Sequence, residues 1–86
     1  MNYLIIPAYQ PDLNLVKLVR LVHAKSDLEI IVVDDGSDDD KKVIFDKLDG
    51  LATVLTHEHN QGKGQSLKTA YASVSYTHLT LPTILL

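Results

Sequence analysis

Short apolar runs alternate with segments of helical periodicity along this chain. Apolar residues gather at 3–6, 28–33 and 52–56, and each run has the length of a strand. The run at 28–33 shows no regular polar alternation, which is typical of a strand covered on both faces. After each run, apolar residues recur at helical spacing and predict helices near 15–24, 38–49 and 67–74. The order βαβαβα predicts a parallel, right-handed, doubly wound α/β sheet.

Polar residues mark where these helices begin and end. Asp12 or Asn14 can cap the first helix, and Ser37 or Asp38 the second, whose first turn is rich in aspartate. Gly50 is positioned to end the second helix. The apolar positions expected to face the core are Leu15, Leu18, Val19 and Val22 in the first helix, Val43, Ile44 and Leu48 in the second, and Leu67, Ala70, Tyr71 and Val74 in the third.

Residues 75–86 differ from the segment before them. They contain no charged residue and no helical period, and threonine recurs among them. Because they resemble a translated adapter read-through, we predict one domain over residues 1–74, followed by a foreign or irregular tail over residues 75–86. The alternative is a genuine edge strand with Pro82 as a breaker.

Composition and charge narrow the function classes. A chain of 86 residues that is 45% hydrophobic and 22% charged suits one small globular domain. The net charge is -3 and the basic residues are spread from Lys17 to Lys68, which argues against nucleic acid as a partner. The absence of cysteine excludes disulfides and thiolate chemistry. The first apolar run is too short for a signal peptide or a membrane span, so we expect a cytoplasmic protein.

Three polar motifs follow the three predicted strands. They are Pro7-Ala8-Tyr9, Asp34-Asp35-Gly36-Ser37 and Asn60-Gln61-Gly62-Lys63-Gly64. Because ligands of such sheets bind beyond the carboxyl ends of the strands, the motifs should meet at one edge. The side chains of Asp34 and Asp35 should point to opposite faces, one of them toward the ligand crevice. Lys63 and its neighbouring glycines suit an anion.

Together these motifs resemble the nucleotide-binding half of the inverting family 2 glycosyltransferases, which have the Rossmann-like GT-A fold. The resemblance covers about residues 2–74. It implies an enzyme of hexosyltransferase type that transfers a sugar from a nucleotide-sugar, expected to be a UDP-sugar, to an acceptor hydroxyl. It also implies that Asp35 accepts the imide hydrogen of uracil, that Tyr9 and Pro7 wall the base, and that Lys63 contacts the diphosphate. The expected nucleotide-binding residues are Pro7, Ala8, Tyr9, Asp34, Asp35 and Lys63.

Acidic residues are unevenly distributed along the chain. Every aspartate lies at or before Asp49, and the only later acid is Glu58. Family 2 enzymes carry a metal-binding Asp-x-Asp element and a catalytic carboxylate further along, so the resemblance implies Mg or Mn in the full-length protein, with ligands outside this chain. We therefore expect no catalytic or metal-binding residue here, and no activity of the fragment alone. The resemblance also allows membrane association of the full-length protein.

Two other functions fit part of the pattern. A response-regulator receiver, a signalling module, also has a strand that ends in Asp-Asp, but it needs an aspartate after a later strand, and the sequence has none there. A stand-alone nucleotide-binding module would need residues 75–86 to supply a real fourth strand. His57 and His59 share a strand face, but two ligands do not make a metal site, and we expect a solvated pair.

Overall fold

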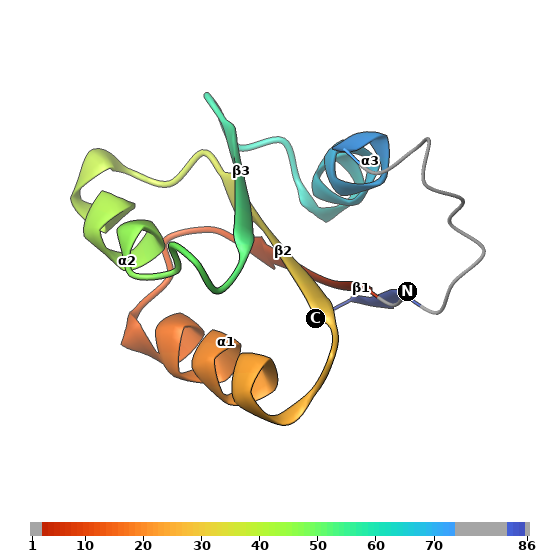
Figure 1. Ribbon diagram of the computed structural model, residues 1–86. Coiled ribbons are helices and arrows are strands. Elements are labelled where there is room, and N and C mark those ends of the chain that lie inside the picture. Colours follow the sequence, from red (N-terminus) through yellow and green to blue (C-terminus); the bar gives the residue numbers. More distant parts are fainter. Residues whose placement is uncertain (1–2, 74–82, 86) are drawn as a thin grey trace.

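The computed structural model describes residues 3–73 and 83–85, which form a parallel sheet between two layers of helices (Figure 1). The sheet has four strands in the order β3-β2-β1-β4. Along the chain, the elements are β1 (Tyr3–Ala8), α1 (Leu13–Lys25), β2 (Glu29–Asp35), the 3-10 helix η1 (Asp39–Lys41), α2 (Lys42–Asp46), β3 (Thr53–His57), α3 (Lys63–Ser73) and β4 (Thr83–Leu85). This alternation of parallel strands and helices is the predicted Rossmann-like α/β pattern, and it is consistent with the GT-A fold.

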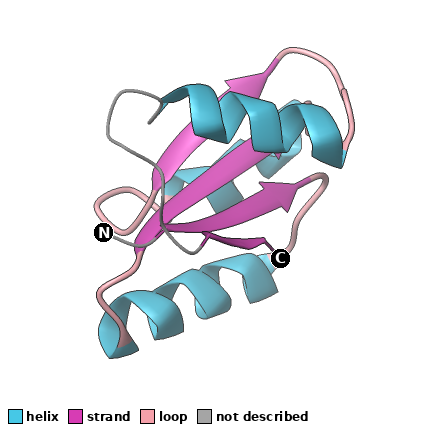
Figure 2. Ribbon diagram, turned by 90° about the vertical axis from the view of Figure 1, so that its right-hand side faces the viewer, coloured by secondary structure: helices cyan, strands magenta, loops and turns pink. Residues whose placement is uncertain are grey.

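The helices divide between the two faces of the sheet. Helices α1 and α2 cover one face and α3 covers the other (Figures 1 and 2). In register, β1 runs beside β2 up to the pair Ala8 and Asp34, and β2 runs beside β3 up to the pair Asp35 and His57. The carboxyl ends of the three strands are therefore level, and the loops that follow them start from the same edge.

The two faces bury two separate apolar clusters. On the α1 and α2 face, side chains such as Leu4 and Val32 pack with Val19, whereas Ile5 and Val33 face α3 with Ala70. Val32 and Val33 are both 0% exposed, so successive residues of β2 are buried on opposite faces. The prediction of a strand covered on both faces is confirmed.

Several boundaries differ from the predicted ones. Strand β1 continues through Pro7 to Ala8 instead of ending before the proline. Pro7 still lies beside Val33 of β2, but β4 pairs with β1 only from Tyr3 to Ile5, so no described strand pairs with Pro7 on its other side, and a proline is tolerated there. Helix α1 begins at Leu13, and its cap is Asp12, whose Oδ1 accepts the N–H of Asn14 at 2.8 Å.

The second helical segment corrects two predictions. It opens with the 3-10 turn η1, so the apolar positions of the following α2 are shifted in phase. Phe45 is 7% exposed and belongs to the core, whereas Val43, a predicted core position, is 55% exposed. Neither Ser37 nor Asp38 caps this segment with its side chain, because both side chains bind Gln10, in the loop after β1.

The sheet also has one strand more than the predicted βαβαβα order. Residues Thr83–Leu85 form β4, which pairs in parallel with Tyr3 to Ile5. Val74, predicted as part of the third helix, lies outside the described residues. That residues 75–86 are foreign to the domain stays a prediction. Among the described residues, none of the helices combines the length and the apolar character that a membrane crossing requires.

Candidate functional site at the carboxyl edge of the sheet

The loop after β1 is bound to the loop after β2 by one glutamine. Gln10 adopts a left-handed backbone conformation with a φ of 52°. Its backbone N–H donates to Ser37 Oγ at 2.9 Å, and its side-chain amide donates to Asp38 Oδ2 at 2.7 Å. In return, the backbone N–H of Asp38 donates to Gln10 Oε1 at 2.8 Å. These bonds hold the two loops in a fixed relative position.

The loop after β2 also touches the loop after β3, at a glycine. Gly36 has a φ of +79°, and a Cβ atom built on it would lie 2.4 Å from the backbone N of Asn60 and 2.4 Å from the carbonyl carbon of His59. Only glycine allows the two backbones to approach so closely. The loops after the three strands therefore meet at one edge of the sheet.

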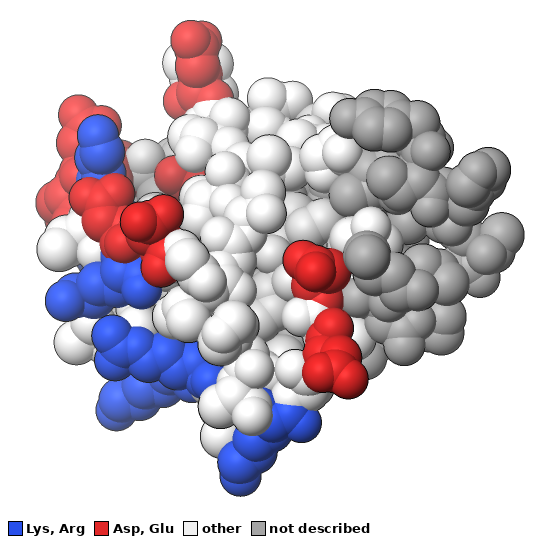
Figure 3. Space-filling model, in the orientation of Figure 1, with Lys and Arg blue, Asp and Glu red and all other residues white. Residues whose placement is uncertain are grey.

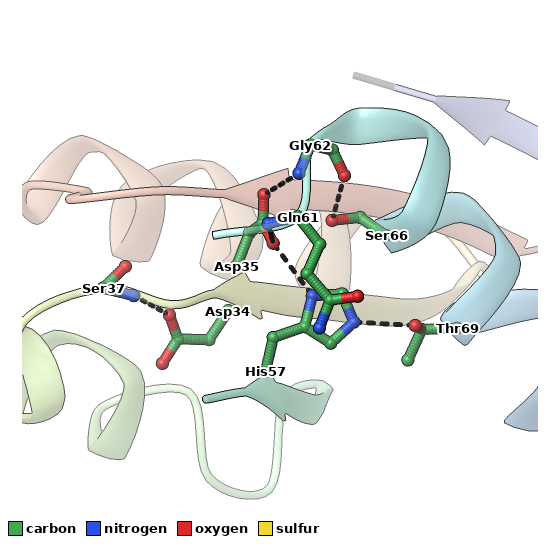
Figure 4. Close-up of polar contacts among 8 residues, drawn as sticks. All are labelled: Asp34, Asp35, Ser37, His57, Gln61, Gly62, Ser66 and Thr69. Atoms are coloured by element: carbon green, nitrogen blue, oxygen red, sulfur yellow. Dashed lines mark hydrogen bonds and ion pairs between the residues drawn. The ribbon is translucent and has the colours of Figure 1, made fainter. Parts of the chain in front are cut away.

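The adjacent carboxylates Asp34 and Asp35 lie on opposite faces of β2, as the strand geometry predicts (Figure 4). Asp34 shares its face with the α1 and α2 layer, and its Oδ1 accepts the backbone N–H of Ser37 at 2.9 Å. Asp35 lies on the α3 side and is 4% exposed. The two acids therefore have different partners and different surroundings.

Three donors converge on the carboxylate of Asp35. Oδ1 bonds His57 Nδ1 at 2.8 Å and the backbone N–H of Gln61 at 2.8 Å, and Oδ2 accepts the backbone N–H of Gly62 at 2.9 Å (Figure 4). On the far side of the imidazole, His57 Nε2 lies 2.7 Å from Thr69 Oγ1, on α3. A carboxylate has about four acceptor positions, so one remains, on Oδ2.

These bonds stabilise the ionised form of Asp35. Burial by itself raises the pKa of its carboxyl group, but the hydrogen bonds from His57, Gln61 and Gly62 outweigh burial, and the pKa lies below its ordinary value. Asp35 is therefore an ionised group that can only accept hydrogen bonds at neutral pH. The site can chemically recognise an N–H or O–H donor.

The other predicted site residues differ in their exposure. Tyr9 is 56% exposed and Pro7 is half-buried, at the end of β1. Lys63 is exposed at the first residue of α3, directly after the Asp35-bound amides. Ala8 is buried in the core cluster on the α1 and α2 face. Ala8 is the last residue of β1, and its side chain lies on the face of the sheet that contacts this cluster.

A groove of about 790 Å³ lies between α2 and β3, on the face of the sheet that α1 and α2 cover. Among the described residues, six carboxylates line it together with one lysine, Lys42, and with His57; the carboxylates are those of Asp34, Asp38, Asp39, Asp46, Asp49 and Glu58. Acidic side chains accordingly gather over α2 and the end of β3 (Figure 3). A diphosphate would be repelled in this groove, and Asp35 does not line it.

Sequence reasoning missed the histidine that bonds Asp35. His57 was expected to be solvated with His59, but it is 9% exposed and bonded to Asp35, whereas His59 is exposed. The missed signal is the register, since His57 stands directly opposite Asp35. Gln10 and Thr69 were also missed. The described ranges contain no group of three histidines, aspartates or glutamates that could hold a metal ion.

Comparison with known proteins identifies a family. The model of the family described as Glycosyl transferase family 2 matches residues 3–81, which is most of the chain. Neither the curated proteins nor the solved structures give a significant match. The family match agrees with the Rossmann-like α/β pattern described above. The chain belongs to glycosyltransferase family 2.

Proposed function

We propose that this chain is the nucleotide-binding part of an inverting glycosyltransferase that uses a UDP-sugar and an acceptor hydroxyl. Membership of the family supports a glycosyltransferase with a nucleotide-sugar donor, and it sets the receiver-like signalling module aside. The observation that carries the finer proposal is the ionised Asp35 at the junction of the loops after β2 and β3.

The chemistry of Asp35 favours uracil over cytosine. Uracil presents an N–H donor at N3, which the remaining acceptor position of Asp35 Oδ2 can bind. Cytosine presents a lone pair at the same position, so a carboxylate would repel it. In this arrangement the exposed ring of Tyr9 stacks on the base and Pro7 lies beneath it.

The charges around the edge favour Lys63 as the diphosphate contact. The groove between α2 and β3 is lined by carboxylates, whereas Lys63 is exposed at the N-terminus of α3, where the helix dipole also favours an anion. We place the diphosphate on the α3 side of Asp35 for this reason.

Metal binding and proton abstraction are assigned to parts of the full-length protein outside this chain. The described residues do not fit a Mg or Mn site, because no three acidic or histidine side chains cluster among them. The proposal is therefore that the 86-residue chain binds the nucleotide but transfers no hexose alone. A cytoplasmic location and a membrane-associated full-length protein stay predictions.

Equilibrium binding of UDP and of uridine tests this function. The wild-type chain should bind UDP in the millimolar range, and Lys63→Ala should weaken UDP but leave uridine unchanged, because only UDP carries the diphosphate. Lys42→Ala is the matched control, since Lys42 lines the acidic groove. Equal weakening of UDP by the two lysine variants, or no binding to a folded wild-type chain, would contradict the proposal.

A further inference from the structure

One buried imidazole separates the proposed ligand contact from α3. His57 lies on edge strand β3, opposite Asp35 in register, and both side chains face α3. The side chains of His57 and Asp35 are 8% and 6% exposed. The imidazole bonds Asp35 through Nδ1 and Thr69 through Nε2, so both ring nitrogens are occupied.

The partners fix where the imidazole proton lies. The ionised Asp35 can only accept, so Nδ1 of His57 must carry a hydrogen in either protonation state of the ring. In the neutral ring, Nε2 is then an acceptor, and the hydroxyl of Thr69 donates to it. Thr69 thus supports the tautomer that donates to Asp35.

We propose that His57 and Thr69 are positioning residues for Asp35: they hold its carboxylate so that the outer lone pair of Oδ2 faces the ligand and selects a base with an N–H donor. The inference rests on the proposed function, and it adds two residues that the three edge motifs do not contain. Without the His57 bond, Oδ1 would lose one of its two donors, and only the backbone N–H groups of Gln61 and Gly62 would hold the carboxylate against rotation about its bond to Cβ. A rotated carboxylate would no longer present a fixed acceptor to N3 of uracil.

The three donors of Asp35 together explain why the remaining acceptor position is on Oδ2. Gln61 and Gly62 bind different oxygens of Asp35, so they set the plane of the carboxylate from one side. His57 completes the set on Oδ1, which then has two donors, whereas Oδ2 has one. The arrangement is asymmetric, and the asymmetry requires His57.

Substitutions of His57 that remove both ring nitrogens, or that keep only a donor to Asp35, test the proposal in the 86-residue chain. The ratio of the CDP and UDP dissociation constants is measured by NMR titration. His57→Leu removes both bonds and should lower this preference for UDP about tenfold, the loss expected for one hydrogen bond to a charged group. His57→Asn should keep most of the preference, because its side-chain amide can donate to Asp35 in place of Nδ1.

The hydroxyl of Thr69 provides a second and milder test. Thr69→Val should lower the preference for UDP, and Thr69→Ser should restore it, because only serine keeps the donor. Ser73→Ala is the matched control, since Ser73 is also a hydroxyl on α3 but donates to the carbonyl of Ala70. If His57→Leu does not fold, the comparison of Thr69→Val with Thr69→Ser decides the question.

Nitrogen NMR of the imidazole reports which ring nitrogen of His57 carries the proton, and a role in packing alone would not fix that position. The neutral ring of His57 should show a protonated Nδ1 and an unprotonated Nε2, and an Nε2–H tautomer would overturn the proposal. The proposal would also be overturned if a folded His57→Leu variant still bound UDP and kept the wild-type ratio of CDP and UDP affinities. A wild-type chain that binds no uridine nucleotide would instead refute the proposed function.

Discussion

Replacing Gly36 with alanine tests whether the close approach of two loops organises the edge of the sheet. The added Cβ would have to lie 2.4 Å from backbone atoms of His59 and Asn60, and backbone cannot move aside as a flexible side chain can. The loop after β3 would be displaced, together with the amides of Gln61 and Gly62 that bind Asp35.

The expected loss has two parts. The left-handed conformation of Gly36, with a φ of +79°, costs alanine about 1–2 kcal/mol. Displacement of the loop breaks at least one backbone bond to a buried carboxylate, which adds about 1.5–3 kcal/mol. We therefore expect Gly36→Ala to lower the free energy of unfolding by about 3 kcal/mol or more.

Gly50→Ala is the matched control for this substitution. Gly50 has nearly the same φ, +80°, but a Cβ there would meet nothing within 4 Å. The control should therefore lose only the conformational part, about 1–2 kcal/mol. Urea unfolding of the two variants, with midpoints and slopes compared, measures the difference. Equal losses in the two variants would refute the reasoning that the loops are in contact at Gly36.

Three further predictions follow from single contacts. Asp12→Ala should cost about 1 kcal/mol of unfolding free energy, whereas Asn14→Ala should cost much less in the same urea assay, because only Asp12 provides the capping oxygen. Phe45→Ala should cost about 3–5 kcal/mol and Val43→Ala less than about 0.5 kcal/mol, since only Phe45 is buried; similar losses would contradict the described phase of α2. Because the pKa of Asp35 is lowered in the folded chain, its ionised form stabilises the fold above about pH 4, and this contribution is lost as the pH falls through the lowered pKa. Urea midpoints should therefore show wild type and Asp35→Asn converging below about pH 4, and a constant difference would count against the Asp35 network.

The order of elements could be predicted from the sequence because it depends on local patterns. The run before Asp34 lacks regular alternation, and β2 is indeed buried on both faces. The position of the polar motifs at one edge then follows from topology, since parallel strands end on the same side. The phase of α2 could not be predicted in the same way, because the 3-10 turn before it follows directly on Ser37 and Asp38, whose bonds to Gln10 join segments 27 and 28 positions apart in sequence.

Local sequence patterns could not predict the hydrogen-bond partners of Asp35. His57 is 22 positions away in sequence, and its environment depends on the register between β2 and β3 and on the placement of α3. A histidine followed by polar residues resembles a solvated strand end, so periodicity alone gave the wrong expectation for it. The pairing of a buried acid with a buried histidine appears only when the strands are aligned.

Mapping the UDP contact by NMR on the 15N-labelled chain tests the central claim most directly. If the loops after the three strands form one uridine site, UDP should shift the amide signals of Tyr9, Asp35 and Lys63 together, with a common dissociation constant. Signals of the acidic groove, such as those of Asp46 and Asp49, should change little. Shifts confined to that groove, or an unchanged spectrum of the folded chain at millimolar UDP, would contradict the account.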